Sequence, residues 1–168
     1  MSIGKKLADV WPDDMSVRMD PEKPKDVKLL DYISNYEKVV LVSPKLRDFL
    51  RAQELRDVEY LPVAILDHKK RIASRDYSIV NSVRVIDAVN QEKSDFRWDG
   101  LENPSMVVTK IVLNDESLGD EDKLIRLRFV PGKILFREDL MRAIEAATFS
   151  GVAFTRRAFG DFEVYGRR

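Results

Sequence analysis

The chain has 168 residues, of which 44% are hydrophobic and 35% charged, and its 29 basic and 29 acidic side chains give a formal net charge of zero. This composition is typical of a soluble globular domain that needs no disulfide or structural metal. A balanced charge argues against a general nucleic-acid-binding protein, because such proteins carry a basic excess to contact phosphates.

Cysteine is absent from the sequence, which excludes disulfides, thiolate zinc sites and cysteine nucleophiles. The N-terminus has no apolar run of signal-peptide length, and no segment approaches the roughly 20 apolar residues of a membrane span. We therefore expect a cytoplasmic protein that does not contact a membrane.

The first 36 residues are expected to form a variable, loosely structured lead-in packed on a domain of residues 37–168. Three prolines in the first 24 residues disfavour regular structure there. Within the lead-in, "KDVKLLDYI" at residues 25–33 indicates a helix.

The first firm elements follow the lead-in. The apolar run Val39–Val42 predicts a buried strand. Ser43 and Pro44 then predict a helix start, because the serine hydroxyl can accept a backbone N–H and proline at the first helical position loses no needed bond. The apolar face of this helix comprises Leu46, Phe49 and Leu50. The chain returns to a strand from Val58.

A shift of 94 positions places this strand–helix–strand pattern, residues 38–63, on residues 132–157. Each pair of matched positions keeps its apolar character: Leu46 and Leu140, Leu50 and Ile144, Ala52 and Ala146, Leu55 and Phe149, Val58 and Val152, Tyr60 and Phe154. One explanation is a unit used twice. The other is that two strand–helix–strand units share this pattern by physics alone. Both explanations assign these residues to the core.

Between the two units, residues 106–114 and 123–130 predict two strands joined by an acidic turn. In the second strand, alternation places Ile125, Leu127 and Phe129 on one face and Arg126 and Arg128 on the other. Pro131 and Gly132 fit a type II turn and predict a bend. The expected fold is a single α+β domain with a mixed sheet of about seven strands and about three helices.

The sequence offers no evident catalytic, cofactor or metal site. The only histidine, His68, has charged neighbours and is expected in a solvated turn. Neither G-x-G-x-x-G nor a P-loop motif is present, so no loop is a candidate for binding phosphate. Transition metals would lack ligands other than carboxylates. A small carboxylate-dependent hydrolase, with its acids assembled only by the fold, remains an alternative.

Two clusters of charge interrupt the chain. The acidic cluster comprises Asp115, Glu116, Asp120, Glu121 and Asp122. Its spacing does not match a calcium loop, which leaves a solvated hairpin tip or a docking patch for a basic partner. The basic cluster comprises Lys69, Lys70, Arg71 and Arg75. It contains no aromatic residue to stack on bases, so a solvated loop is favoured over RNA binding.

In the segment "RDYSIVNSVRVIDAV", Asn81 and Ser82 interrupt an apolar strand pattern. We predict that the Asn81 side chain bonds nearby backbone groups and holds a change from strand to helix. Arg84 and Asp87 are expected to engage other protein groups.

Together with the two units, this segment resembles a family of bacterial immunity proteins encoded beside polymorphic toxins. The matching positions are Val80, Asn81, Arg84 and Asp87, followed near the end by Gly151, Val152 and Phe154. The resemblance covers about residues 38–157. It departs from the family pattern at Arg137, where a serine cap would be more typical of the second helix, and the first 35 residues lie outside it.

The resemblance implies a non-enzymatic inhibitor that binds a cognate toxin by occlusion, with no cofactor and no nucleic-acid partner. Asn81, Arg84, Asp87 and Gly151 would then be structural, and the acidic cluster would be the candidate partner-binding surface. A hydrolase and a generic protein-interaction domain are the alternatives. The oligomeric state stays open.

Overall fold

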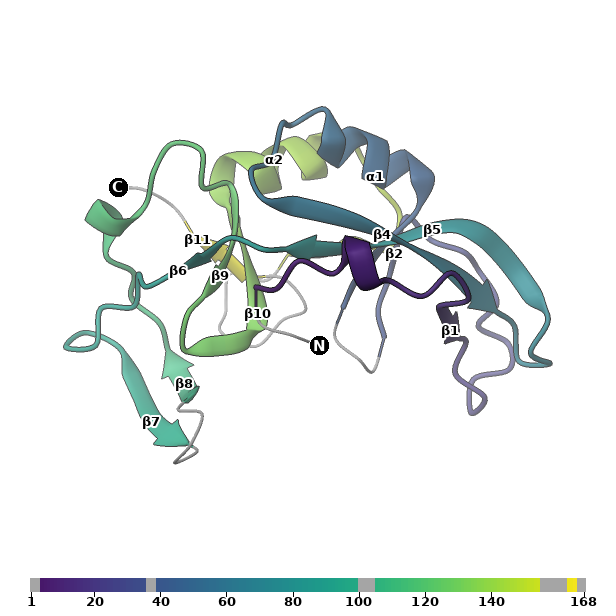
Figure 1. Ribbon diagram of the computed structural model, residues 1–168, viewed down its shortest axis with the longest axis horizontal. Coiled ribbons are helices and arrows are strands. Elements are labelled where there is room, and N and C mark those ends of the chain that lie inside the picture. Colours follow the sequence, from purple (N-terminus) through teal and green to yellow (C-terminus); the bar gives the residue numbers. More distant parts are fainter. Residues whose placement is uncertain (1–3, 36–38, 100–104, 155–162, 166–168) are drawn as a thin grey trace.

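The computed structural model describes residues 4–35, 39–99, 105–154 and 163–165. In these residues two α-helices lie together on one side of a molecule built from three sheets (Figure 1). The largest sheet has the order β1-β4-β5-β3-β2, with β1 parallel to β4 and all other neighbours antiparallel. Its strands are β1 Ser16–Arg18, β2 Tyr32–Ile33, β3 Val40–Val42, β4 Val58–Leu66 and β5 Ile72–Ser82.

The second sheet has the order β11-β10-β9-β6 and also mixes parallel and antiparallel neighbours. Its strands are β6 Val85–Ile86, β9 Leu124–Leu127, β10 Val130–Arg137 and β11 Glu163–Tyr165. The remaining two strands, β7 (Asp95–Asp99) and β8 (Ser105–Lys110), pair with each other and project from the body (Figure 1).

The predicted α+β class with a mixed sheet is confirmed, but the single sheet of about seven strands is wrong. The chain leaves the five-stranded sheet after Ser82 and enters the four-stranded sheet at Val85, so the strand pattern is divided between two sheets. The predicted hairpin between residues 106–114 and 123–130 is also wrong. β8 pairs with β7, whereas β9 pairs with β10 and β6.

The described residues contain two α-helices, α1 (Pro44–Arg51) and α2 (Glu138–Ala146), and two short 3-10 helices, η1 (Ala8–Val10) and η2 (Asp115–Ser117). About three helices were expected, and the one predicted over residues 25–33 does not form. That segment is mostly irregular, and its end pairs with β3 as strand β2, so strand pairing overrides the local helical pattern.

The turn predicted at Pro131 and Gly132 lies three residues earlier, at Arg128 and Phe129, where it joins β9 to β10. Pro131 and Gly132 belong to β10, next to a shift of strand register between Val130 and Ile134. A register shift leaves backbone groups unpaired, which is where a proline without an N–H is tolerated in a strand.

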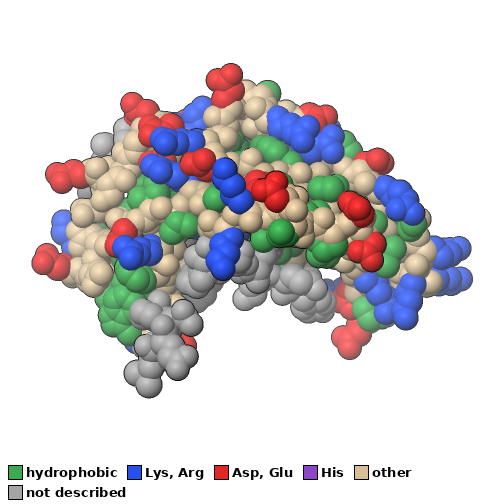
Figure 2. All heavy atoms as spheres, viewed as in Figure 1, with side chains coloured by type: hydrophobic (Ala, Val, Ile, Leu, Met, Phe, Trp, Pro, Cys, Tyr) green, Lys and Arg blue, Asp and Glu red, His purple; other side chains and the backbone are tan. Residues whose placement is uncertain are grey.

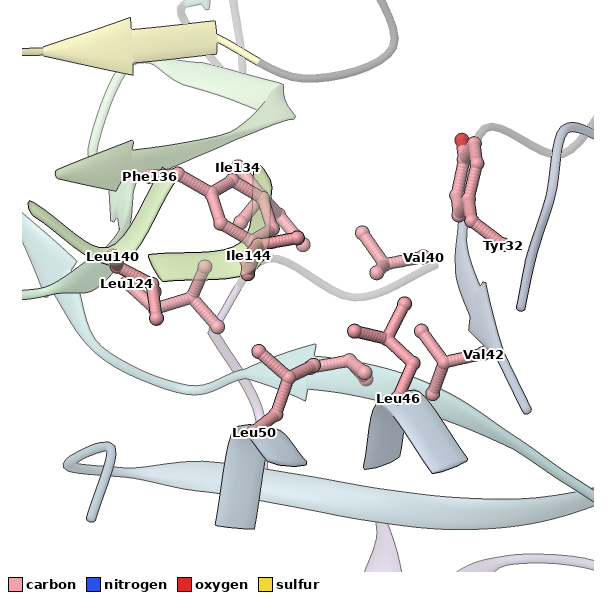
Figure 3. Close-up of a cluster of buried hydrophobic side chains, with 11 residues drawn as sticks. Tyr32, Val40, Val42, Leu46, Leu50, Leu124, Ile134, Phe136, Leu140 and Ile144 are labelled. Atoms are coloured by element: carbon pink, nitrogen blue, oxygen red, sulfur yellow. The ribbon is translucent and has the colours of Figure 1, made fainter. Parts of the chain in front are cut away.

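The main core is a cluster of eleven buried side chains drawn from both helices and both larger sheets (Figure 3). Its members are Tyr32, Val40, Val42, Leu46, Leu50, Val80, Leu124, Ile134, Phe136, Leu140 and Ile144. Burying one leucine or isoleucine stabilises a fold by roughly 1.5–3 kcal/mol relative to leaving it exposed. Because one cluster is shared, the two sheets cannot separate without exposing it.

The lead-in covers the opposite face of the five-stranded sheet. Apolar side chains of the lead-in pack against this face: Leu7, Trp11, Met15, Val17 and Met19. The indole Nε1 of Trp11 also donates a hydrogen bond to the carbonyl oxygen of Pro62, at 2.7 Å. Strand β1 adds to the sheet beside β4. The lead-in therefore completes a hydrophobic cluster, where the sequence predicted a loosely structured segment.

The two matched units share their helix exits as well as their apolar faces. Glu54 and Thr148, which are 94 positions apart, both have positive φ, at 51° and 53°. Asp57 and Gly151, also 94 apart, have φ of 52° and 79°. The amide of Glu54 bonds the carbonyl of Arg51, and the amide of Thr148 bonds the carbonyl of Glu145, which are again equivalent positions. Of the segment equivalent to β4 in the second unit, the structure describes residues 152–154, and these are irregular.

Asp31 joins the two units. Its carboxylate accepts hydrogen bonds from the Ser43 hydroxyl at 2.7 Å, and from the backbone N–H and hydroxyl of Ser150 at 2.9 and 2.7 Å. Ser43 caps α1 by accepting the Leu46 N–H, as the sequence predicted. Burial alone would raise the pKa of Asp31, but the bonds from Ser150 and Ser43 hold it below its usual value. The start of α1 and the loop after α2 are thus held by one charge.

Candidate functional site

Asn81 lies inside β5 and is fully buried. Its amide Nδ2 donates to the backbone carbonyl of Lys5 at 3.0 Å and to the Glu59 carboxylate at 2.8 Å. The predicted bond to a backbone group is therefore present, although its partner is distant in sequence. The predicted change from strand to helix is wrong, because β5 is followed by strand β6. Asn81 instead holds the lead-in against the sheet.

Glu59 completes this attachment and was not identified from the sequence. Its carboxylate accepts the backbone N–H groups of Leu7 and Ala8 at 2.9 and 3.2 Å. Burial would raise the pKa of Glu59, but these bonds and the Asn81 amide lower it overall. A glutamate in a strand carries no sequence signal for such a contact, because its partners are backbone groups of another segment.

Arg84 and Asp87 each face an opposite charge. The Arg84 guanidinium contacts the Asp122 carboxylate at 2.8 Å, and Asp87 lies 3.6 Å from the Arg128 guanidinium. The carboxylate of Asp122 is almost completely buried and also accepts the backbone N–H of Gly119 at 2.8 Å. The Arg84 pair therefore anchors the acidic cluster to the strand connection after β5.

Gly151 is required by its surroundings. Its φ is +79°, and a Cβ at this position would lie 2.3 Å from the carbonyl oxygen of Tyr32. Only glycine combines this backbone conformation with so close an approach. The position lies next to Ser150, so it fixes the loop that bonds Asp31.

The acidic cluster is not a simple solvated hairpin tip. Glu121 pairs with Arg56 at 2.8 Å, Asp122 is buried against Arg84, and Arg137 donates to the carbonyl of Asp120. Leu118, between the acids, is buried in a hydrophobic cluster with side chains of β9 and β10. Asp115 and Glu116 lie exposed in η2. A docking role for the cluster stays a prediction, and the burial of Asp122 makes that side chain unsuitable for contact with a partner.

His68 occupies the turn between β4 and β5, but its ring is not solvated as predicted. Both ring nitrogens are buried, and neither has a hydrogen-bond partner among the described residues. The carbonyl oxygen of His68 accepts a bond from the Arg18 guanidinium at 3.2 Å, which ties the turn to β1. The imidazole thus fills space at the base of a charged turn.

In the described part of the chain, no three His, Asp or Glu side chains gather closely enough to hold a metal ion. The alternative of a carboxylate-dependent hydrolase therefore gains no candidate metal centre there. Within the same ranges, no helix is long and apolar enough to cross a membrane.

The model of the Imm11 immunity protein family matches residues 4–158. The chain belongs to this family. The match confirms the resemblance to an immunity protein family and extends it from residue 38 back to residue 4, so the lead-in lies within the family region. No curated protein matches the sequence. Family membership points to toxin immunity as the general role.

Proposed function

We propose that this member of the Imm11 family binds a cognate bacterial toxin and neutralises it by covering its active surface, without catalysis of its own. The observation that carries this proposal is the family match over residues 4–158, which includes both units and the lead-in.

The roles of the polar residues support a binding protein built as a rigid scaffold. Asn81, Glu59 and Asp31 each make at least one hydrogen bond to a backbone group or hydroxyl of a distant segment of the fold. These contacts fix loops and the lead-in, which lowers the entropic cost of presenting a shaped surface to a partner. The toxin's active site would be blocked by contact area, so no reactive side chain is needed on the inhibitor.

The proposal places the protein in the cytoplasm of the producing cell, where it would meet a toxin that enters or is made there. The partner would be the product of a neighbouring toxin gene, and no membrane or nucleic acid would be needed for the complex. The generic interaction-domain alternative differs in one respect, since it predicts no protection against any toxin.

Stoichiometry tests the mechanism. The purified neighbouring gene product is assayed for its toxic activity while this protein is added in increasing amounts. Occlusion predicts a linear loss of activity that ends near one equivalent at concentrations well above Kd. Full protection at a few hundredths of an equivalent would show that the chain acts catalytically, and no protection at excess would refute immunity.

Specificity provides the control. A toxin of the same chemistry from an unrelated genome should keep its activity at equal concentrations of this protein, because occlusion depends on a complementary surface. A bacterial host that expresses the neighbouring toxin should resume growth only when this chain is co-expressed.

A further inference from the structure

The turn between β4 and β5 carries positive charges that the fold does not neutralise. We define the cationic turn as Arg18, Lys69, Lys70 and Arg75. All four side chains are exposed, and none has a carboxylate partner among the described residues. The remaining cation of this region, Arg71, is bound to Asp67 at 2.7 Å and is therefore compensated.

The Asp67 side chain holds the turn together through hydrogen bonds to its backbone. Its carboxylate accepts the backbone N–H groups of Arg71 and Lys69, both at 2.8 Å, and the Arg71 guanidinium. The bond from the Arg71 backbone is the main reason that the pKa of Asp67 lies below its usual value. The one acid of the turn is thus used to shape it, and the two lysines extend from its tip.

Lys70 occupies a backbone conformation that glycine would adopt at lower cost. Its φ is +62°. A non-glycine residue in the left-handed region costs roughly 1–3 kcal/mol, and such residues concentrate at functional sites. Glu54, Asp57 and Thr148 share this conformation, so it assigns no role to the Lys70 side chain by itself and serves here only to place Lys70 at the tip of the turn.

Strand register gathers these charges at one end of the five-stranded sheet. Arg18 in β1 lies opposite Leu66 in β4, which lies opposite Ile72 in β5. Lys and Arg side chains gather on the surface at this end of the molecule (Figure 2). Ile72 is 49% exposed beside them. A hollow of about 270 Å³ adjoins the turn, lined by Leu66, Ile72 and Arg75 among others.

Three acids lie near the turn and differ in their distance from its cations. Asp76 follows Arg75, and successive side chains of a strand point to opposite faces. Asp13 and Asp14 also line the hollow. They precede Ser16, which is opposite Ala64, three residues before the turn begins. That offset from the tip with Lys69 and Lys70 is about 10 Å by strand rise, beyond the screening length of about 8 Å at physiological salt. Arg75, in contrast, lines the same hollow as these two acids.

The acidic cluster at residues 115–122 differs from the cationic turn, because part of its charge is paired within the fold. Two of its carboxylates are paired with Arg56 and Arg84. The cationic turn, by contrast, brings four exposed cations to one end of the five-stranded sheet in a chain that is neutral overall.

We propose that the cationic turn is the docking surface for the toxin, and that the toxin contributes an acidic surface with an apolar group that covers Ile72. This inference rests on the proposed function and adds the surface and the charge of the partner. Carboxylates would pair with Lys69, Lys70 and Arg75, and long-range attraction would speed encounter. A nucleic acid fits less well, because no aromatic side chain lines the hollow for base stacking.

The test is the association rate with the neighbouring toxin, measured by stopped flow at low and physiological salt. The triple variant Lys69→Glu, Lys70→Glu, Arg75→Glu should associate about 10-fold more slowly at low salt. Its rate should also depend less on salt, and its thermal unfolding should stay close to that of wild type. The variant Ile72→Ser should mainly raise the dissociation rate.

A matched control carries the same change in net charge at the other end of the molecule. Lys93→Glu, Arg97→Glu and Lys110→Glu reverse three exposed cations on and beside the β7–β8 hairpin. This control should associate at nearly the wild-type rate. Equal slowing by both triple variants would show an effect of net charge alone and overturn the assignment of the turn.

Charge reversal in the acidic cluster should have the opposite effect on the association rate. If the toxin is acidic at the contact, Asp115→Lys with Glu116→Lys should leave the association rate unchanged or raise it. Slower association of this variant, with a normal rate for the turn variant, would transfer docking to the acidic cluster. Displacement of the toxin by duplex DNA at physiological salt would assign the turn to nucleic acid.

Failure of this inference is distinguishable from failure of the proposed function. If the wild-type chain protects against the toxin and the turn variant protects with unchanged kinetics, only the docking surface is refuted. If the wild-type chain does not bind the toxin at all, both proposals are refuted.

Discussion

The two strand–helix units of this protein place equivalent side chains in one core but begin and end differently. Leu46 and Leu50 of α1 pack in the same cluster as their counterparts Leu140 and Ile144 of α2. The helix exits also match, with positive φ at two equivalent positions in each unit. Matching backbone conformations go beyond what shared apolar spacing requires, and they favour duplication over two unrelated units of similar pattern.

The starts of the helices differ. Ser43 caps α1 through its hydroxyl, whereas Arg137 precedes α2 and makes no side-chain cap. Arg137 instead binds both carboxylate oxygens of Asp139, at 2.7 and 2.8 Å. The return segments differ too, because β4 has β1 and β5 as neighbours, whereas residues 152–154 form no strand. The comparison teaches that apolar spacing determines the core, while the available neighbours determine caps and strands.

The largest expected effect tests the shared core. Leu50 is 1% exposed and Ile144 is 2% exposed. Leu50→Ala and Ile144→Ala should each lower the free energy of unfolding by about 2–5 kcal/mol, through lost burial and a residual cavity. Urea unfolding of each variant measures the change.

The exposed Val10 provides the control, since Val10→Ala should change stability by less than about 0.5 kcal/mol. The double variant at Leu50 and Ile144 should deviate from additivity, because neighbours in one cluster relax together. A loss below 1 kcal/mol at either position would mean that one unit does not contribute to the core as its partner does.

The second prediction is that substitutions at the equivalent positions Asp57 and Gly151 affect stability differently. Gly151→Ala should destabilise by about 1–3 kcal/mol or more, because the left-handed conformation strains alanine and its Cβ would meet the carbonyl of Tyr32. Asp57→Gly should change stability by no more than about 1 kcal/mol, because relief of the same strain offsets the added chain entropy. Thermal and urea unfolding would measure both, and equal effects would show that the close approach at Gly151 is not what requires glycine.

The sequence predicted those features that depend on neighbours along the chain. The apolar face of α1, its Ser43 cap, the strand at Val40–Val42 and the shared face of Ile125 and Leu127 are all present. These features follow from periodicity and from bonds within one turn of helix.

Features that depend on distant partners were not predictable. The helix expected over residues 25–33 does not form, because the end of that segment pairs with β3. The expected hairpin does not form either, because β8 pairs with β7 and β9 pairs with β10. Glu59 and Asp31 owe their roles to backbone groups about 50 and 120 positions away. The burial of Asp122 depends in the same way on Arg84. Charge counting along the chain therefore could not separate acids used by the fold from cations left exposed.

The smallest expected effect concerns the start of the second unit. The bonds from Arg137 are the main cause that lowers the pKa of Asp139 to about 2. In the unfolded chain an aspartate titrates near pH 3.9. Because the folded pKa is lower, the pair stabilises the fold above about pH 4, and this contribution is lost as pH falls from about 4 towards 2.

The variant Arg137→Ser introduces the serine that the first unit has at its equivalent position and removes this pair. Since Asp139 is largely exposed, the pair contributes no more than about 1 kcal/mol. The difference in stability between wild type and variant should therefore be small at pH 5 and should change, in favour of the variant, as pH falls to 2.5. An NMR titration should place the pKa of Asp139 nearer 4 in the variant.

The control Arg142→Ser breaks the neighbouring pair with Glu138 on the same helix and leaves Arg137 in place, so it should preserve the low pKa of Asp139. If the pKa of Asp139 is ordinary in the wild type, Arg137 does not replace a cap electrostatically, and the two helix starts differ only in sequence.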